Sequence, residues 1–468
     1  MVWNNGKIKD TVITYIGGGS RGWAWTFMTD LALDDEISGE VRLYDIDEEA
    51  AAVNATIGNH LMARDEAKGS WRFEVKSTLQ EALTGCDFVV ISILPGTFDE
   101  MESDVHLPER LGIWQSVGDT AGPGGMIRAI RTIPMFVEIA KAIETYAPEA
   151  WVINYTNPMS LCVKALYETF PGIKAFGCCH EVFGTQKVLQ EIYEKETGER
   201  IADWHDVIVN VIGINHFTWF TEASYGGIDL FPVYQSFIEK HFDEGIRLDS
   251  ENWLNANFIC AHRVKMDLFR RFGLIAAAGD RHLAEFMPGS EYLKDPATAA
   301  SWDFTLTSVK WRKEDLKERL ARAGRLSSGE EEMALTPTGE EGILLIKALC
   351  GLSRFVSNVN IPNRALQIPN LPSDAVVETN AVFTRDHIRP IDAGPVPEQI
   401  RALLMPHIEN HALTWRAAAA CDRNLLVRAF MNDPLVKGHD CTETDVRLLI
   451  DDMIANTKAF LPSGWERP

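Results

Sequence analysis

Long apolar runs are absent from this sequence of 468 residues. No stretch approaches the roughly 20 apolar residues that a membrane-spanning helix requires. The first residues, Met1 to Lys7, also lack the apolar core of a secretion signal. We therefore expect a cytoplasmic protein that has no membrane partner.

Basic residues and patterned cysteines are also in short supply. Lys and Arg number 45 against 67 Asp and Glu, which gives a formal net charge of −22. Nucleic acids and anionic membranes attract clustered Lys and Arg, so this balance argues against both as partners. The eight cysteines are scattered without the spacing of a disulfide framework and are expected to be reduced thiols. Internal repeats and low-complexity tracts are missing as well.

The sequence does contain an alternation of short β-branched runs and helical segments over about its first 215 residues. This alternation is typical of a doubly wound, mostly parallel sheet, and the pattern beyond it becomes mainly helical. We predict an α/β fold with a Rossmann-like domain over residues 1–200. A mainly helical α+β domain over residues 201–468 is expected to carry catalytic, metal-binding and oligomerisation functions. The predicted strands are Thr11–Ile16, Val41–Tyr44, Phe73–Ser77, Phe88–Ile93, Trp151–Asn154, Ala175–Gly177 and Val207–Ile212, and the last is expected to extend the same sheet.

Several helices and one loop can also be placed. Apolar residues on one face predict a helix over Thr132–Tyr146. Another helix is expected to start at Pro158, with Asn157 as its N-cap. The polar, turn-rich stretch 327–342 is predicted to be a mobile loop.

A glycine motif follows the first predicted strand. Gly17, Gly19 and Gly22 satisfy G-x-G-x-x-G, a helical stretch follows, and the second strand ends at Asp45. Such glycines let the backbone approach a pyrophosphate, and an acid in this position binds the ribose hydroxyls. A simple glycine-rich turn is the alternative. Asp45 would repel a 2′-phosphate, so NAD is expected rather than NADP, with Asn154 at the end of another strand also in the cofactor site.

The segment Cys178-Cys179-His180-Glu181 directly follows a short apolar strand, and a helix is expected from about Gly184. Loops beyond the carboxyl ends of parallel strands form the ligand crevice of such folds, so a thiol, an imidazole and a carboxylate are expected there. A metal ion bound beside the nicotinamide would use them, whereas an inert buried Cys pair is the alternative. His216 also follows a predicted strand, although a lone His in that position is more often a core or loop residue.

Four ordered motifs resemble glycoside hydrolase family 4. They are Gly17-Gly-Gly-Ser20, Asn154-Tyr-Thr-Asn-Pro158, Cys179-His180-Glu181 and Gly213-Ile-Asn-His216. Within that family, the amino-acid sequence around residues 177–185, 116–120 and 279–286 is most similar to that of α-galacturonidases. Members that act on 6-phosphoglycosides carry Asp after the ligand Cys, where this chain has His180.

The resemblance implies an unusual redox mechanism. NAD⁺ takes hydride from C3 of the sugar, a base removes the proton on C2, and Mn²⁺ on O2 and O3 holds the enediolate charge. The glycosidic oxygen leaves, water adds, and the retained NADH reduces C3. By the same resemblance Cys179 and His216 are the Mn²⁺ ligands, His180 is the leaving-group acid, and Asn157 binds sugar hydroxyls.

The base is less well defined by the resemblance, because relatives use different residues. Asp280 and His282 are the candidates here, and Asp280 is favoured. Arg281 and His282 could pair with a C6 carboxylate, since a guanidinium fork matches a carboxylate well. A local surface ion pair between Asp280 and Arg281 is the alternative. Asp119, in a glycine-rich loop, is expected to orient substrate or a metal-bound water, unless it is a plain turn residue.

These inferences predict an enzyme that hydrolyses α-galacturonides with NAD and Mn²⁺ and that assembles as a homodimer or homotetramer. The same mechanism on an α-glucuronide, an α-galactoside or a sulfonated sugar remains open. So do a plain NAD-dependent dehydrogenase and a non-catalytic NAD-binding sensor. A dehydrogenase would release NADH in step with substrate consumption, whereas the hydrolase would release none.

Overall fold

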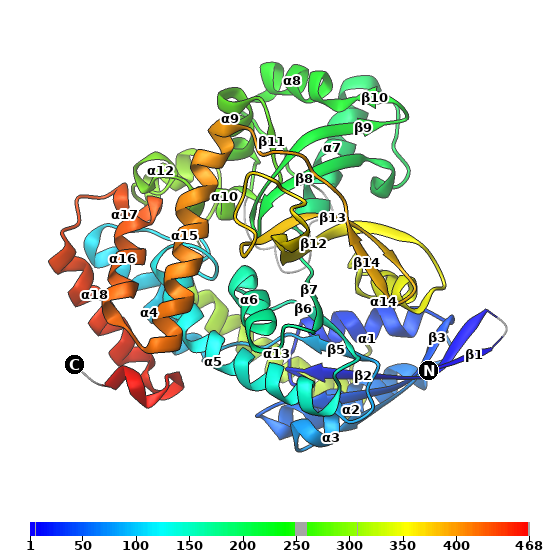
Figure 1. The fold of residues 1–468 in the computed structure, drawn as a ribbon. Coiled ribbons are helices and arrows are strands. Elements are labelled where there is room, and N and C mark those ends of the chain that lie inside the picture. The colour runs from blue at the N-terminus through cyan, green and yellow to red at the C-terminus, as the bar shows by residue number, and fades with distance from the viewer. Residues whose placement is uncertain (5, 249–259, 307, 467–468) are drawn as a thin grey trace.

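The computed structural model describes residues 1–4, 6–248, 260–306 and 308–466. Its larger sheet has the strand order β14-β13-β12-β7-β6-β5-β2-β3-β4, with β1 paired to β2 (Figure 1). The neighbours from β7 to β4 are parallel, whereas β12, β13 and β14 are antiparallel to the strands beside them. The strands are β1 Val2–Asn4, β2 Lys7–Ile16, β3 Ile37–Tyr44, β4 Ser70–Val75, β5 Phe88–Ile91, β6 Trp151–Asn154, β7 Lys174–Gly177, β12 Phe355–Pro362, β13 Val376–Thr384 and β14 His387–Pro390.

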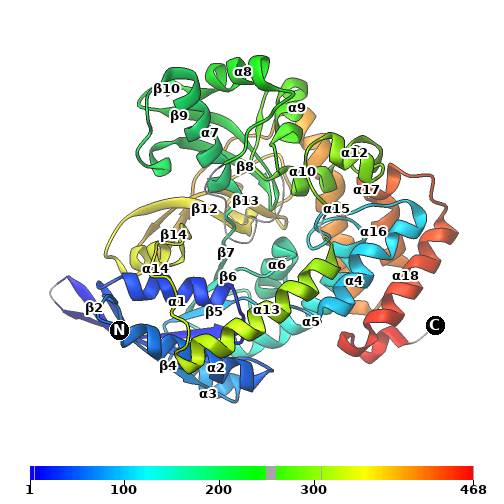
Figure 2. The same ribbon diagram turned by 180° about the vertical axis from the view of Figure 1, so that it is seen from behind.

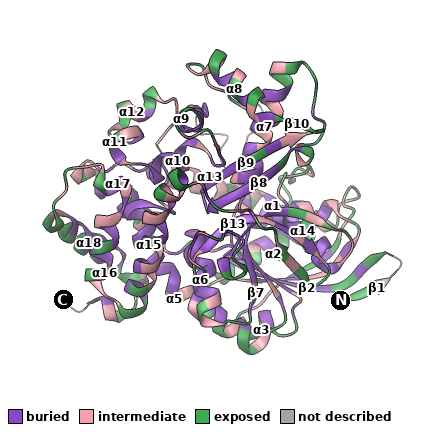
Figure 3. Cartoon of the chain, turned by 45° about the horizontal axis from the view of Figure 1, so that its top comes forward, coloured by how far each residue is buried: buried purple, intermediate pink, exposed green. Residues whose placement is uncertain are grey.

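Helices cover both faces of this sheet, because alternate residues of its central strands enter different cores. Ile13 and Phe88 pack in one core with α1, α2 and α14, whereas Val89 and Ile91 pack in another with α3, α5 and α6. Figure 3 shows these strands as predominantly buried. Burial on both faces explains their nearly continuous apolar sequences and confirms the predicted doubly wound architecture. These helices are α1 Trp23–Leu33, α2 Glu48–Met62, α3 Leu79–Leu83, α5 Gly122–Tyr146, α6 Met159–Thr169 and α14 Gly342–Cys350.

A second, four-stranded sheet lies in the other half of the molecule, and its strands are β8 Ile208–Ile214, β9 Phe217–Tyr225, β10 Ile228–Asp229 and β11 Ile275–Ala276. The expectation that residues 207–212 extend the first sheet is therefore wrong. A tight turn joins β8 directly to β9, and the two strands pair antiparallel with Ile214 opposite Phe217. A hairpin satisfies the strand's backbone hydrogen bonds locally, so it does not need the edge of the larger sheet.

The remaining helices surround the two sheets, and most belong to the second half of the chain (Figures 1 and 2). They are α4 Phe98–His106, α7 Glu181–Thr197, α8 Leu230–His241, α9 Arg263–Phe272, α10 Asp280–Phe286, α11 Gly289–Tyr292, α12 Pro296–Ser301, α13 Val309–Ser328, α15 Glu398–Ala420, α16 Arg423–Asn432, α17 Pro434–Lys437 and α18 Glu443–Thr457. Short 3₁₀ turns cover Pro108–Leu111, Trp204–Asp206, Asn363–Ala365, Lys458–Phe460 and Ser463–Glu466. Within the described ranges, no helix is both long and apolar enough to cross a membrane.

Three local expectations need correction. The helix after the Cys-His segment begins at Glu181, so His180 is its N-cap and the start near Gly184 is wrong. Asn157 does not cap α6, which begins at Met159, because the Asn157 side chain turns instead towards Asp119. The loop expected over 327–342 is present, but it is shorter, since α13 extends through Ser328 and α14 begins at Gly342.

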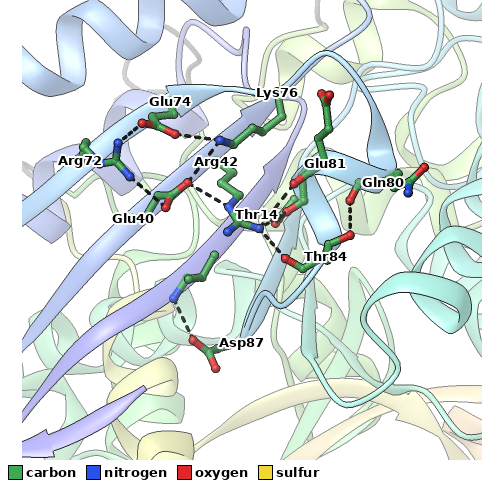
Figure 4. Close-up of polar contacts among 12 residues, drawn as sticks. Thr14, Glu40, Arg42, Arg72, Glu74, Lys76, Gln80, Glu81, Thr84 and Asp87 are labelled. Atoms are coloured by element: carbon green, nitrogen blue, oxygen red, sulfur yellow. Dashed lines mark hydrogen bonds and ion pairs between the residues drawn. The ribbon is translucent and has the colours of Figure 1, made fainter.

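A network of ion pairs covers the outer strands β3 and β4 (Figure 4). Glu40 pairs with Arg42 at 2.9 Å and with Arg72 at 3.2 Å, and Glu74 pairs with Lys76 at 2.7 Å. Arg42 also donates to the Thr84 carbonyl at 2.7 Å and so ties β3 to the end of α3. Each charge in this network has an opposite charge beside it.

Candidate active site

A cleft of about 770 Å³ lies between α1, α7, α10, α13 and the loop before α14. Figure 2 shows α13 running from the neighbourhood of α4 towards α2, which brings a distant part of the chain to this region. Among the residues lining the cleft are Arg21, Gly22, Trp25, His180, Glu181, Lys187, Cys260, His262, Lys265, Arg281, His282, Asp315, Arg319 and Glu340. Many of these groups are polar, so the cleft suits a polar ligand rather than an apolar one.

One side of the cleft is bordered by the glycine-rich turn after β2. Gly17 has φ +95°, and a Cβ there would lie 2.0 Å from the Ser92 carbonyl oxygen, so only glycine fits. The Gly19 amide donates to Asp45 Oδ2 at 2.8 Å, which fixes the turn against the end of β3. Gly22 precedes α1, whose first turn carries no acidic residue. This close backbone approach at an uncovered helix N-terminus fits a dinucleotide pyrophosphate.

Asn154 has a mainly structural environment at the end of β6. Its Oδ1 accepts from the Thr156 amide and its Nδ2 donates to the Thr156 carbonyl, each at 3.0 Å. The Thr156 hydroxyl in turn accepts from the Ile93 amide at 2.9 Å. Asn154 thus shapes the turn that holds the ends of β5 and β6 together beside the expected cofactor position.

A carboxylate and two imidazoles converge at the centre of the molecule. Ligand atoms of Asp119, His216 and His282 all lie within 4.8 Å of one another, and the two imidazole centroids are 3.8 Å apart. His216 reaches this point from the β8–β9 turn, where its backbone is left-handed with φ 62°. Asn157 donates to Asp119 Oδ2 at 3.3 Å. The set of carboxylate oxygen and imidazole nitrogens suits Mn²⁺.

The hydrogen bonds around Thr120 fix the tautomer of His216. The Thr120 hydroxyl donates to Asp119 Oδ1 at 2.7 Å, and it lies 3.0 Å from His216 Nδ1. Because the hydroxyl proton is used on Asp119, Nδ1 must be the donor to Thr120. The lone pair of His216 then lies on Nε2, which is the arrangement a metal-binding imidazole needs.

Electrostatics keep these imidazoles neutral. Burial, reinforced by the neighbouring His282, lowers the pKa of His216 to about 3. Burial also lowers the pKa of His282. Burial alone would raise the pKa of Asp119, but the Arg128 charge and the hydrogen bond from the Thr120 hydroxyl act to lower it, and the pKa lies below its ordinary value. Neutral imidazoles beside an ionised carboxylate are ready to bind a cation without first losing a proton.

Cys179 belongs to neither of the two groups of ligand atoms that converge in the described structure. It lies beyond β7, where its carbonyl accepts from Asn358 Nδ2 at 3.1 Å. Burial, followed by the nearby Glu378 carboxyl, raises the pKa of the Cys179 thiol. The thiol would therefore have to release its proton when it binds a metal.

His180 lies at the cleft wall, before the first turn of α7. Its ring stacks on Trp23 with a centroid distance of 5.8 Å, and its Nδ1 is 3.9 Å from Glu340 Oε1. The adjacent Glu181 accepts from the Gly279 amide at 2.6 Å, which joins α7 to the loop before α10. An imidazole held between an aromatic ring and a carboxylate, with access to the cleft, is suited to proton transfer.

Asp280 and His282 differ sharply in position. Asp280 is fully buried, and its two oxygens accept from the Val264 and Lys265 amides, each at 3.1 Å, at the start of α9. Burial raises its pKa to about 6. Arg281 and His282 line the cleft, and Asp280 is not among the lining residues. Because Asp280 and Arg281 are both buried, the alternative of a local surface ion pair is wrong.

Arg281 is anchored to a distant segment of the chain. Its Nη2 donates to the Ser116 carbonyl at 3.0 Å, and the Ser116 hydroxyl donates to the Arg281 carbonyl. This pairing holds α10 against the glycine-rich loop that carries Asp119. The Arg281 guanidinium thus combines a fixed position with exposure to the cleft.

Sequence reasoning missed Cys260 and His262, whose ligand atoms also converge with Asp280. The two side chains line the cleft next to Lys265, which donates to Thr185 Oγ1 at 2.8 Å. Their only signal in the sequence is a Cys-Ala-His spacing, which is common by chance. Because Lys265 already balances the Asp280 charge, this group is a poorer cation site than the one around Asp119.

Comparison with known proteins places the chain in a family. Residues 12–195 match the profile of the family 4 glycosyl hydrolases, and residues 211–436 match the profile of that family's C-terminal domain. The chain belongs to glycosyl hydrolase family 4. It is therefore an enzyme of the glycosidase class, as the motifs had indicated.

Individual members of family 4 extend this result over the whole length. An α-galacturonidase from Lachnoclostridium phytofermentans is 65% identical over 465 residues, which cover 99% of this chain and 100% of that protein. A crystal structure of a Bacillus subtilis protein described as a glucosidase is 50% identical, with a TM-score of 0.89 over 95% of this chain and 100% of that one. A 6-phospho-α-glucosidase from gut microorganisms, solved in complex with NAD and Mn²⁺, shares the fold at 21% identity, with a TM-score of 0.78 over 97% and 99% of the two chains.

Proposed function

We propose that this family 4 enzyme hydrolyses α-galacturonides. The observation that carries the proposal is the 65% identity, over its entire length, to an α-galacturonidase. The site is consistent with an acidic sugar, because the Arg281 guanidinium is fixed in the cleft wall close to His282. A uronate carboxylate transferred from water into such a cleft requires a cationic partner.

We propose NAD and Mn²⁺ as the cofactors. Gly17, Gly19 and Gly22 provide the close backbone approach that a pyrophosphate needs, and Asp45 lies where the ribose hydroxyls are expected. A fold relative has been solved with both NAD and Mn²⁺. When bound, NAD supplies reversible oxidation at C3 of the sugar, and Mn²⁺ supplies charge stabilisation at O2 and O3.

Residues of the chain would then carry out the remaining tasks. His216 is proposed to bind the metal through Nε2, together with Cys179, and the convergent Asp119 and His282 are the other available ligands. Asn157, which already contacts Asp119, is placed to bind sugar hydroxyls. His180 would donate its proton to the departing glycosidic oxygen.

The base that removes the C2 proton is proposed to be Asp280 or His282. A raised pKa favours Asp280 as a proton acceptor near neutral pH, but its oxygens already accept from two backbone amides. His282 lines the cleft, and its Nδ1 is buried and lacks a hydrogen-bond partner in the described structure. Substitution of each residue separates the two candidates.

The substrate is tested with nitrophenyl α-galacturonide, α-glucuronide and α-galactoside, each assayed with NAD⁺, Mn²⁺ and a thiol reductant. We expect kcat/KM for the α-galacturonide to exceed that for the α-galactoside by about 10²-fold or more, which is the size of one charge-assisted hydrogen bond. The same assay follows absorbance of NADH, which should not accumulate. Equal turnover of the acidic and neutral sugars would refute the substrate assignment and leave the family assignment intact.

The elimination route is tested by running the hydrolysis in D₂O. Removal and return of the C2 proton should leave deuterium at C2 of the released sugar, because direct displacement never breaks that bond. Mass spectrometry and NMR of the product report the label. Complete hydrolysis without label at C2 would contradict this route.

We also propose a cytoplasmic location and assembly as a homodimer or homotetramer. All eight cysteines are free, as expected for a reducing compartment. Light scattering coupled to size-exclusion chromatography would measure the oligomeric state directly.

A further inference from the structure

Arg312 is a charged residue near the active site whose position no sequence motif indicated. It lies in the first turns of α13, and its Nε is excluded from solvent without a hydrogen-bond partner in the part of the chain that the structure describes. The ion pairs of α13 near this point belong to its neighbours, since Lys313 pairs with Asp99 at 2.6 Å and Arg319 pairs with Asp315 at 2.5 Å. A guanidinium nitrogen that is withdrawn from water without a hydrogen-bond partner costs free energy, so a functional reason is expected.

The charged groups around Arg312 are predominantly positive. Arg128, Arg281 and Arg312 lie in the same electrostatic neighbourhood, and Asp119 is the acid they share. Burial, followed by repulsion from Arg281, lowers the pKa of Arg312 to about 10. Close by, burial raises the pKa of Glu285 to about 8, so this carboxyl is largely neutral at pH 7. The charge balance of this region therefore favours the binding of one more negatively charged group.

The helix that carries Arg312 contributes to the cleft wall, although Arg312 itself is not among the lining residues. Asp315, one turn further along α13, and Arg319, two turns further, both line the cleft. Arg319 is already held by Asp315 at 2.5 Å and donates to the Arg21 carbonyl at 3.2 Å. Arg312 lacks such an acidic partner on its own helix, and the positive end of α13 adds to its attraction for anions.

We propose that Arg312 acts with Arg281 as the binding site for the C6 carboxylate of the sugar and is a specificity-determining residue. Arg281 is fixed by the Ser116 carbonyl and supplies one rigid donor group, whereas Arg312 supplies a cation that has no carboxylate partner within the described chain. A carboxylate between the two guanidinium groups relieves their repulsion and gains charge-assisted hydrogen bonds. This inference rests on the proposed α-galacturonide specificity.

The test compares Arg312→Gln with Lys310→Gln, which removes an exposed positive charge from the same helix. For Arg312→Gln we expect kcat/KM on nitrophenyl α-galacturonide to fall about 10²-fold, as for loss of one charge-assisted bond. Turnover of the neutral α-galactoside should change by less than about 3-fold. Arg312→Lys should lie between these limits, because it keeps the charge but loses the fork. Lys310→Gln should match the parent enzyme.

Thermal unfolding without substrate distinguishes a binding role from a structural role. Loss of a structural residue would lower Tm, whereas loss of a binding residue should not. Since Arg312 is a half-buried cation whose Nε lacks a hydrogen-bond partner in the described structure, Arg312→Gln should leave Tm unchanged or raise it. Addition of galacturonate should raise Tm of the parent protein but not of Arg312→Gln, whereas NAD⁺ should act on both alike.

The outcomes separate this inference from the proposed function. If the parent enzyme shows no preference for the galacturonide, the proposed function itself fails. If the parent enzyme prefers the galacturonide and Arg312→Gln keeps that preference, Arg312 is not part of the carboxylate site. A lower Tm for Arg312→Gln, with equal losses on acidic and neutral sugars, would assign Arg312 a structural role and overturn the inference.

Discussion

Two groups of charged residues in this protein are organised in opposite ways. On the outer strands β3 and β4, Glu40, Arg42, Arg72, Glu74 and Lys76 form ion pairs with one another. Arg72 has 62% of its side chain exposed, so water screens much of the network. At the centre of the molecule, the charges around Asp119 are largely buried, and their pairing is incomplete.

The difference indicates where the protein accepts an energetic cost in order to function. A surface network of matched pairs contributes little to stability and nothing to chemistry. Histidines with lowered pKa values, an ionised acid and mutually repelling arginines, all withdrawn from water, are costly to fold, and such groups are concentrated where substrates and cations bind. Substitutions in the two regions should therefore have effects of very different size and kind.

The largest effect is expected at His216. His216→Ala should lower kcat by about 10³-fold or more, because metal-type charge stabilisation supplies several kcal/mol. Mn²⁺ affinity, measured by calorimetry on the NAD-loaded protein, should fall in parallel. The exposed His387→Ala is the matched control and should behave as the parent. Unchanged Mn²⁺ binding in His216→Ala would remove this residue from the metal site.

Features formed by residues that are close together in the sequence could be predicted well. The strand preceding Gly17, the turn itself and Asp45 at the end of the second strand all lie between Lys7 and Asp45, and backbone sterics dictate their arrangement. Six of the predicted strands occur in the large sheet. They could be predicted because strands that are buried on both faces have continuous apolar sequences.

For the centre of the site, the sequence predicted which residues take part but not how they are arranged in space. Asp119, His216 and His282 were each singled out, yet His216 reaches the others through a hairpin of a different sheet. Arg312 gave no signal, because a charged helix reads as a solvated surface until its neighbours in space are known. Asp119, His216 and His282 are far apart in the sequence, and contacts between such residues depend on tertiary packing, which periodicity and spacing do not encode.

A second large effect should separate the two candidate bases. Loss of a positioned base lowers kcat by about 10²–10⁴-fold, and either Asp280→Asn or His282→Gln should do so. Asp280→Asn should also lower Tm, because the buried carboxylate receives two amides of α9. The decisive measurement is exchange of the C2 proton of the substrate into D₂O. The variant that retains C2 exchange has not lost the base.

A smaller effect is expected in the pH dependence of stability at Glu285. Burial raises its pKa from 4.5 to about 8, so the folded state holds a proton that the unfolded state releases. Stability from this group is complete below about pH 4.5 and is lost as pH rises through about 8. Glu285→Gln should remove this dependence, which amounts to a few kcal/mol on the order of the pKa shift.

Unfolding in urea at about pH 5 and about pH 9 measures the Glu285 effect. The parent protein should lose stability relative to Glu285→Gln between these two values. The neighbouring contacts are expected to survive, because the amide oxygen of Gln can still accept from the Val117 and Gly118 amides. A parent protein that gains stability relative to Glu285→Gln as pH rises would show that Glu285 is ionised in the fold.

The smallest effect is expected in the surface network, and it completes the contrast between the two regions. Arg72→Ala removes contacts with Glu40 and Glu74 from a side chain that is 62% exposed. The loss of stability should be below about 1 kcal/mol, because exposed pairs gain little in water and Lys76 remains beside both acids. Raising the salt concentration should reduce even this difference between the two proteins. A loss of several kcal/mol, or a fall in kcat/KM, would mean that the outer strands are coupled to the site more strongly than their charge pairing implies.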